Sequence, residues 1–276
     1  MSFLVLLLVV WVEKFSAWRR RVQQDGPWLK LLQYSEQRWS GSPWLALAVL
    51  VLGPLLALAL TLLLLEPLVY GWLALPVHLW VVVYSLGRGD LQAALGPFRD
   101  SWRRSDAEAA YLVARRDLGV DADSESELLQ RVQGHLLWQA YQSFFAVIFW
   151  YALLGPLAAL AYRLLALSAE HAGQETLRER AVQLRHAMDW LPVRVLAAAF
   201  ALVGNFSAVS RALLHEVLSW DISAAQLVIK AGRAADDTPQ PCLGEAGVST
   251  LDGLWQLLVR AAVLWYALLA VWTLLI

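Results

Sequence analysis

The feature that most constrains this chain is a long apolar stretch at residues 41–87. Its only formal charge is Glu66, which with Pro67 beside it leaves uncharged runs at residues 41–65 and 67–87. A helix needs ~20 apolar residues to cross a bilayer, so each run is long enough to span. The short connection therefore predicts a transmembrane hairpin of two antiparallel helices. Tryptophan and tyrosine near the ends of both runs are typical of anchors at the membrane interface.

The composition agrees with a membrane protein and excludes several other classes. Hydrophobic residues make up 59% of the 276-residue chain and charged residues 16%, against about 45–50% and 25% in soluble domains. The net charge of −1 gives no basic surface for nucleic acid. A single cysteine, Cys242, excludes an intrachain disulfide and a cysteine-built metal site. HExxH spacing and glycine-rich nucleotide motifs are absent, so we expect no metal and no cofactor.

We expect an all-α, polytopic membrane protein: one helical domain over residues 1–276, with about 4–6 membrane helices and amphipathic cytoplasmic helices. Residues 1–12 are apolar but lack the features of a signal peptide, and we interpret them as a short retained helix. Residues 13–40 carry six Lys and Arg, which the positive-inside rule places in the cytoplasm. The hairpin returns the chain to the same side, so residues 88–133 are expected to form a cytoplasmic helical insert.

Capping signals divide that insert into two helices. Ser105 with Glu108, and Ser124 with Glu127, fit capping boxes at helix starts. Gly119 fits a helix stop between them. The second helix is expected to continue unbroken into a membrane segment at residues 134–163.

The dipeptide Gly155-Pro156 leaves two topologies open. A kink would let one helix cross and would place residues 163–190 in the periplasm; a turn would return the chain and keep them in the cytoplasm. An amphipathic helix is expected from Thr176, with a second membrane segment at 191–210. Residues 211–250 are polar and rich in loops after Asp236, and residues 251–276 predict a C-terminal transmembrane helix. The apolar face of the amphipathic helix would comprise Leu177, Ala181, Leu184 and Met188.

Charged residues near the ends of the apolar segments are candidates for binding. Arg88 and Asp90 close the hairpin and could grip a phosphate or a metal ion, or could simply mark a charged boundary. Arg163 ends the third apolar run, either as an anchor at the interface or as a ligand for an anionic headgroup.

The sequence DWLPVR at residues 189–194 is less ordinary. Pro192 suits the first turn of a helix, and Asp189 is then favoured near its N-terminus. Arg194 would lie inside an apolar helix, where a charge costs ~2.5 kcal/mol or more, so we expect it to pair with Asp189 or to bind an anion. In the turn topology, one net-positive cluster suited to a phosphate or carboxylate would form from Arg88, Asp90, Arg163, Asp189 and Arg194.

These motifs carry a family resemblance. The order is GRGDL (87–91), then Trp138-x-x-Tyr141 with an apolar motif containing Trp150, then GPLAALAYR ending at 163, then DWLPVR with Trp190 and Pro192. Together they resemble the AmpE family of multi-pass bacterial inner-membrane proteins over essentially the whole chain. The resemblance implies signalling linked to cell-wall metabolism and to induction of AmpC-type β-lactamase. It implies contact with membrane lipids, and it leaves open whether the further partner is an anionic lipid, a cell-wall metabolite or another inner-membrane protein.

The AmpE family is in turn similar to the cobalamin-biosynthesis enzymes CobD/CbiB, which use ATP and magnesium. Those enzymes carry an acidic cluster before a Phe-Trp pair, whereas residues 136–143 here contain no carboxylate. Magnesium-nucleotide chemistry relies on hard oxygen ligands. We therefore expect no catalytic residue, and a ligand- or partner-binding protein on an enzyme-derived scaffold. The alternative is a membrane-embedded ligase or transferase of cobinamide-phosphate-synthase type that uses Asp90 and Asp189.

Overall fold

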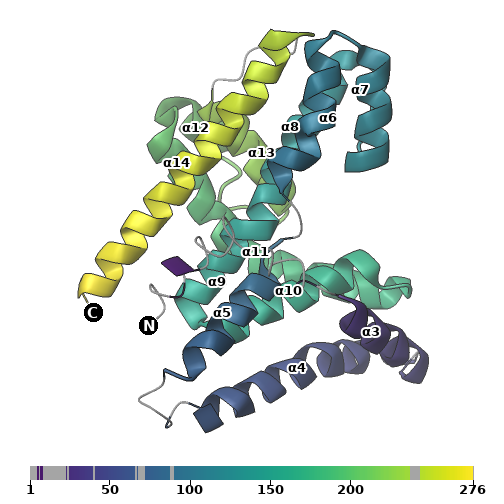
Figure 1. Ribbon diagram of the computed structural model, residues 1–276, viewed down its shortest axis with the longest axis vertical. Coiled ribbons are helices and arrows are strands. Elements are labelled where there is room, and N and C mark those ends of the chain that lie inside the picture. The colour runs from purple at the N-terminus through teal and green to yellow at the C-terminus, as the bar shows by residue number, and fades with distance from the viewer. Residues whose placement is uncertain are drawn as a thin grey trace. The chain divides into compact units, whose positions relative to one another are not determined.

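The computed structural model describes residues 5, 7–8, 23, 25–39, 41–65, 67, 72–87, 90–236 and 243–275. Within these residues the chain is helical and has no strand (Figure 1), which confirms the all-α prediction. In the same ranges four helices are long and apolar enough to cross a membrane, as expected for a polytopic protein. They are α4 (Pro43–Leu65), the continuous helix Glu125–Leu154, α11 (Glu175–Val203) and α14 (Glu245–Leu275).

Contacts divide the chain into two compact units. Unit 1 comprises Met1–Gly87 and Ala146–Pro192, and unit 2 comprises Arg88–Phe145 and Val193–Ile276. The helix Glu125–Leu154 consists of α8 (Glu125–Ala140), a π-helical turn η3 (Tyr141–Phe145) and α9 (Ala146–Leu154). Its continuity agrees with the expected unbroken helix into the membrane. One domain over residues 1–276 stays a prediction.

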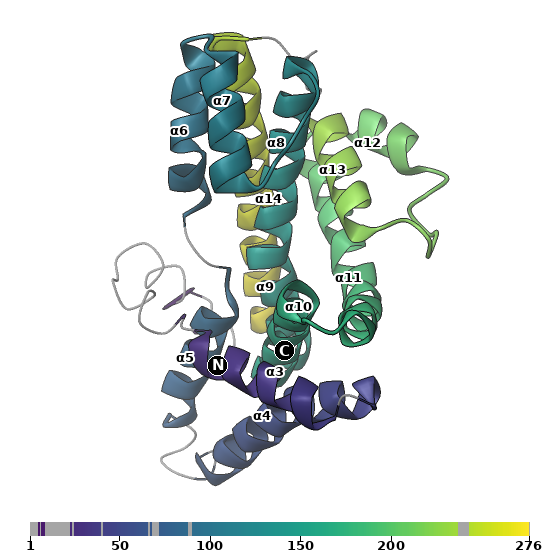
Figure 2. The ribbon, with the colours of Figure 1, turned by 90° about the vertical axis from the view of Figure 1, so that its right-hand side faces the viewer.

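Unit 1 is built around α10 (Pro156–His171), which contacts α4, α5 (Ala74–Ser85) and α9. Helix α3 (Gly26–Arg38) packs on α4 (Figure 2), and its Leu32 joins Leu50, Val81 and Leu164 in one buried core. The opposite side of α4 is apolar and exposed, which fits a helix in contact with lipid. Its exposed leucines lie at intervals of three or four residues: Leu52, Leu56, Leu60 and Leu63.

The second half of the predicted hairpin is shorter than its uncharged run. Helix α5 has 12 residues, and a helix of that length is ~18 Å long, against a hydrocarbon core ~30 Å thick. A crossing by residues 67–87 therefore stays a prediction, while α4 is long enough to span. Glu66 and Arg88 lie outside the described residues. So does most of the helix predicted at residues 1–12.

The chain turns at Gly155. Its φ of +80° and ψ of −165° end α9, and α10 starts at Pro156, in the first helical position. Glycine adopts a positive φ without steric cost, and proline at a helix start lacks only an N–H that has no helical partner. Helix α10 then packs back on α9, in the most extensive pairing of any two helices described. Of the two topologies left open at Gly155-Pro156, the structure therefore has the turn. The side of the membrane on which residues 163–190 lie stays a prediction.

Helix α11 differs from the sequence prediction in two ways. It begins at Glu175 and continues to Val203, so Pro192 lies inside it and not in a first turn. Proline inside a helix costs ~3 kcal/mol, but residues on both sides of it, among them Asp189 and Val193, are buried, and the helix stays continuous. The predicted apolar face is confirmed at Leu177 and Ala181, which are buried, but it is wrong at Leu184, which is 36% exposed while Arg185 takes the buried position.

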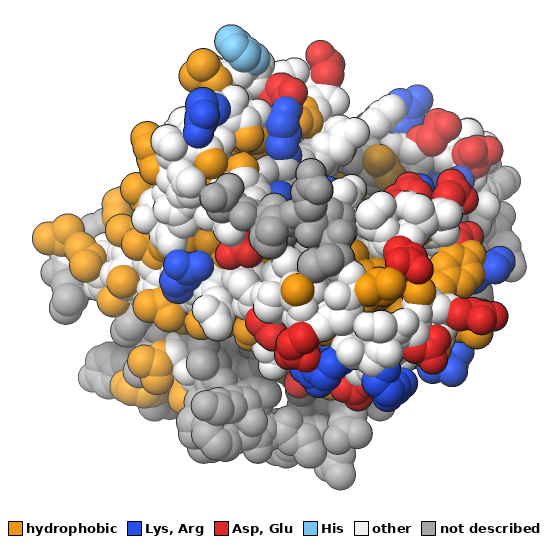
Figure 3. Space-filling view, turned by 90° about the horizontal axis from the view of Figure 1, so that it is seen from above, with side chains coloured by type: hydrophobic (Ala, Val, Ile, Leu, Met, Phe, Trp, Pro, Cys, Tyr) orange, Lys and Arg blue, Asp and Glu red, His pale blue; other side chains and the backbone are white. Residues whose placement is uncertain are grey.

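Unit 2 packs α14 against α6 (Leu91–Arg103) and α8, with α13 (Ala224–Ala235) between the short α12 (Phe206–Leu213) and α8. Polar contacts join α14 to its neighbours. Arg103 Nε donates to Glu245 Oε2 (2.8 Å), and the buried Gln133 Nε2 donates to Thr250 Oγ1 (2.8 Å). Acidic and basic side chains are mixed on the face shown in Figure 3, in keeping with the small net charge.

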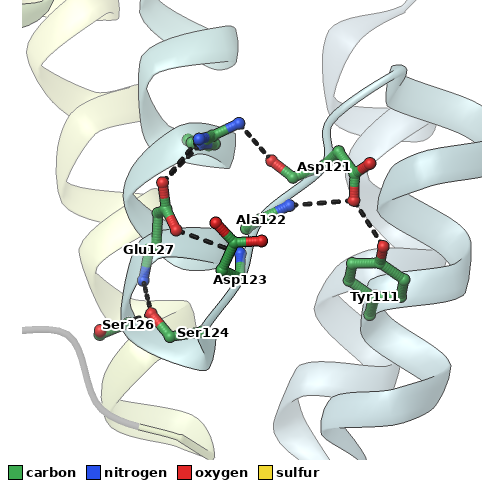
Figure 4. Close-up of polar contacts among 8 residues, drawn as sticks. Tyr111, Asp121, Ala122, Asp123, Ser124, Ser126 and Glu127 are labelled. Atoms are coloured by element: carbon green, nitrogen blue, oxygen red, sulfur yellow. Dashed lines mark hydrogen bonds and ion pairs between the residues drawn. The ribbon is translucent and has the colours of Figure 1, made fainter.

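The caps of α7 (Ala107–Val113) and α8 test the predicted capping boxes. The prediction at Ser105 is wrong: Ser105 has a φ of +57°, and the side chain of Asp106 caps α7. The serine half of the box at Ser124 is confirmed, because its Oγ accepts from Glu127 N–H (3.3 Å; Figure 4), but Glu127 Oε2 accepts from Asp123 N–H (3.1 Å). Gly119, with φ +65°, follows the π-helical turn η2 (Ala114–Leu118) and confirms the predicted stop.

The connection between η2 and α8 gives a pH-dependent prediction. Tyr111 Oη donates to Asp121 Oδ1 at 2.5 Å (Figure 4), and this hydrogen bond is the main cause that lowers the pKa of Asp121. A carboxyl with a lowered pKa contributes stability above its ordinary pKa, and this is lost as the pH falls through the lowered value. We expect Tyr111→Phe to return the pKa of Asp121 toward ~3.9, as measured by NMR titration of carboxyl-labelled aspartate. An unchanged titration would contradict the contact.

A second prediction concerns the start of α11. Glu36 Oε1 of α3 accepts from the backbone N–H groups of Gly173 (2.8 Å) and Gln174 (3.0 Å). A carboxylate at a helix N-terminus satisfies free donors and complements the helix dipole. We expect Glu36→Ala to lower the free energy of unfolding by ~1–2 kcal/mol, measured by denaturant unfolding in detergent. Gln37→Ala, at an exposed position of α3, is the matched control; equal losses would show that the cap does not matter.

Candidate functional site

The best candidate for a functional site is a charge network between α10 and α11 in unit 1, buried except at Glu170. Tyr162 Oη of α10 donates to Asp189 Oδ1 of α11 at 2.8 Å. Arg185 lies one turn before Asp189, with its Nε 3.6 Å from Asp189 Oδ2 and its Nη1 3.6 Å from Glu170 Oε1. Tyr162 and Asp189 are buried, with 1% and 2% of their surface exposed. We refer to these four residues as the α10–α11 network.

Helical spacing and apolar packing create this network. Arg185 and Asp189 are four residues apart, so they lie on one face of α11. Ala181, a turn earlier on that face, packs with Leu165 of α10 and Leu47 of α4 and holds the helices together. The network contains one arginine and two carboxylates, for a formal charge of −1. Because an unpaired charge is costly in an apolar helix, the buried Arg185 and Asp189 need their partners inside the protein, whereas Glu170 is exposed.

Arg163 lies next to Tyr162 in the sequence and has its own partner. Its Nη2 is 3.7 Å from Asp25 Oδ2, and both side chains are largely buried. An arginine paired in this way faces protein, so the ion pair favours neither of the two expected functions of Arg163, an anchor at the membrane interface or a ligand for an anionic headgroup. No sequence motif pointed to Asp25, because the pair joins positions far apart in the chain.

The residues predicted to form one cluster fall in both units. Arg163 and Asp189 belong to unit 1, Asp90 and Arg194 belong to unit 2, and Arg88 lies outside the described residues. A single cluster of these five residues stays a prediction.

Asp90 and Arg194 have structural contacts within unit 2. The carboxylate of Asp90 caps α6 by accepting from the backbone N–H groups of Gln92 (2.9 Å) and Ala93 (3.3 Å). Arg194 Nη2 donates to the carbonyl oxygen of Ser219 at 2.6 Å. Both side chains therefore satisfy backbone groups at helix ends or in loops, as their positions near the ends of apolar segments allow.

The predicted motif aromatics lie on the long helices. Trp138 and Tyr141 stack with ring centroids 5.4 Å apart, and Trp150 makes an edge contact with its neighbour at 5.3 Å. Trp190 and Pro192 lie within α11 beside Asp189. Across the described ranges, no group of three or more His, Cys, Asp or Glu side chains is placed to hold a metal ion.

The α10–α11 network was only partly visible in the sequence. Asp189 was singled out, but Tyr162, Glu170 and Arg185 were not. The available signal was an Arg and an Asp four residues apart beside an apolar run, which predicts a pair on one helix face. Chemically, a buried tyrosine hydroxyl, two carboxylates and a guanidinium can exchange partners when a proton or a cation competes for a carboxylate.

Comparison with known proteins identifies the family. The model described as "Regulatory signalling modulator protein AmpE" matches residues 1–234. The chain belongs to the AmpE family. It is similar to Protein AmpE of Shigella flexneri, with 26% identity over 166 residues, 55% of this chain and 58% of that relative. The match thus spans less than two thirds of the relative's length, and no solved structure matches.

Membership of the AmpE family, with four helices able to cross a bilayer, agrees with the predicted regulatory membrane protein. The further similarity to CobD/CbiB stays a prediction.

The network leads to a stability prediction. Tyr162→Phe removes a donor to the buried Asp189, so we expect the free energy of unfolding to fall by ~1–3 kcal/mol. Arg185→Ala leaves the buried carboxylate of Asp189 with one partner fewer, and we expect a larger loss of ~3–5 kcal/mol. Both are measured by denaturant unfolding of the purified protein in detergent. Tyr34→Phe, at a side chain 59% exposed, should change little, and a matching loss there would argue against the network.

Proposed function

We propose that this protein acts at the bacterial inner membrane as a non-catalytic modulator of the signalling that links cell-wall metabolism to induction of an AmpC-type β-lactamase. The observation that carries the proposal is the AmpE family match over residues 1–234, described as a regulatory signalling modulator. The four membrane-capable helices and the exposed apolar face of α4 support a location within a bilayer.

The α10–α11 network is the proposed responsive element. A regulator needs a part of the fold with two arrangements, between which a ligand or partner protein discriminates. Buried charges suit this use, because a change in one partner alters the packing of two helices at once. In this proposal, a ligand or another inner-membrane protein changes the pairing of Arg185 with Asp189 and Glu170.

The alternative, a ligase or transferase, has less support. Neither the family description nor the relative favours it. Of its two proposed carboxylates, Asp90 accepts two backbone hydrogen bonds as a helix cap, and Asp189 accepts one from Tyr162. Residues 136–143 supply no further carboxylate. Magnesium-dependent ATP turnover by the purified protein would restore this alternative.

The proposal is tested by induction of β-lactamase. A strain that lacks its own copy is complemented with the wild type, Arg185→Gln, Asp189→Asn or Arg178→Gln. We expect the two network variants to lower β-lactamase activity after a β-lactam inducer by about ten-fold or more, since ~1.4 kcal/mol of altered coupling already corresponds to ten-fold. Arg178, largely exposed on the same helix, is the matched control and should induce normally.

Immunoblots of membrane fractions separate signalling from folding. Network variants that are present at wild-type amounts and induce normally would contradict the proposal. If they are absent from the membrane, the milder variant Tyr162→Phe replaces them, because it keeps every charge.

A further inference from the structure

Unit 2 contains an open groove between α8 and α13, with a volume of about 410 Å³. It is separate from the α10–α11 network, which lies in unit 1. Basic, aromatic and aliphatic side chains line it, among them Arg131, His135 and Trp138 of α8 and Ala225, Ile229 and Arg233 of α13.

Glycines bring the two helices of the groove close together. A Cβ on Gly134 would lie 3.0 Å from Ile229 Cδ1, and a Cβ on Gly232 would lie 2.7 Å from Leu137 Cδ2. Gly134 also lines the groove. Because glycine has no side chain, the apolar side chain of Ile229 is exposed to the groove at this point. The groove therefore has an apolar base that comes from the packing of α8 on α13.

Two arginines face the groove from different helices. Arg131 Nη2 donates to Glu127 Oε1 and Arg131 Nη1 to the carbonyl oxygen of Asp121, each at 2.6 Å, in the network of Figure 4. Arg233 donates to the carbonyl oxygen of Gln130. The formal charge of the lining is +1, from Arg131 and Arg233 against Glu127, with histidine neutral. Such a lining fits an anion.

Partial burial of Arg233 disfavours its charged form unless an anion lies beside it. It lowers the pKa of the Arg233 guanidinium, as expected for a cation drawn partly out of water. An anion that reaches this guanidinium meets a lower effective dielectric than at an exposed arginine, and the attraction is stronger there.

The position of the groove along α8 indicates what kind of anion it takes. Arg131 is the last charged residue before the uncharged run that starts at residue 136, and Trp138 lies in its first turn. A tryptophan at such a boundary is typical of the membrane interface. A phospholipid presents its phosphate at this depth and its acyl chains on the apolar side. A small water-soluble anion would make no use of Trp138 and Ile229.

We propose that this groove binds the phosphate group of an anionic phospholipid, with Arg131 and Arg233 at the phosphate and Trp138 and Ile229 along an acyl chain. The site goes beyond the proposed function, since it uses none of the network residues and requires no effect on β-lactamase induction.

The test is a titration of the full chain, purified in detergent, by isothermal calorimetry. Three probes separate the sources of a phosphate: dioctanoyl phosphatidylglycerol, dioctanoyl phosphatidylcholine and glycerol phosphate. Phosphatidylglycerol is expected to bind most tightly, because it alone combines net negative charge with acyl chains. Glycerol phosphate binding as tightly would assign the groove to a soluble phosphate, and phosphatidylcholine binding as tightly would remove the charge argument; either result overturns the proposal.

Variants locate the binding in the groove. Arg233→Gln is expected to weaken phosphatidylglycerol binding about five-fold, as estimated for one basic residue at a membrane surface. Lys230→Gln is the matched control: Lys230 lies on the same helix but pairs with Glu216 at 2.8 Å, outside the groove, and binding should not change. Ala225→Phe fills the groove without removing a charge, so it tests the site even if Arg233→Gln fails to fold. Unchanged affinity in Ala225→Phe would overturn the proposal.

Discussion

The carboxylate of Asp189 lies almost fully buried in a helix apolar enough to cross a bilayer, and this charge constrains the rest of unit 1. In hydrocarbon its partners must come from the protein. One partner, Arg185, is on the same helix, and another, Tyr162, donates a hydrogen bond from α10. Helix α10 must therefore return toward α11, which the turn at Gly155 permits. The same α10 contacts α4, α5 and α9, so one buried carboxylate is tied to the packing of the whole unit.

Features fixed by local chemistry could be predicted from the sequence. An apolar run in lipid can satisfy its backbone only as a helix, and on this ground α4 and the C-terminal helix were predicted. A glycine that can adopt a positive φ predicted the helix end at Gly119. A serine side chain at a helix start predicted the cap at Ser124. Prediction failed where tertiary packing prevailed over local preference, as at Pro192 inside α11. Helix α13 received no prediction, although Ser223 and Gln226 form a capping box before Leu227 and Val228.

The candidate site could be predicted less well, for a related reason. Charges at the ends of apolar segments identified Arg163 and Asp189, yet their described partners, Asp25 and Tyr162, lie far from them in the chain. Hydropathy carries no information about such pairings. Arg185 was missed because the apolar face of α11 was assigned one residue away, to Leu184. In a helix that shift moves a side chain by about 100°, enough to exchange an exposed position for a buried one.

The α10–α11 network and the groove in unit 2 differ in ways that suit different tasks. The α10–α11 network is buried except at Glu170 and carries a formal charge of −1, and its groups pair with each other. The groove in unit 2 is open, carries +1, and shares Arg131 with the connection before α8. An anion bound at Arg131 competes with Glu127 and with the carbonyl oxygen of Asp121 for one guanidinium. A ligand shifts a conformational equilibrium only by its difference in affinity between two states. Occupancy of the groove would therefore act first on the start of α8, where those contacts are made.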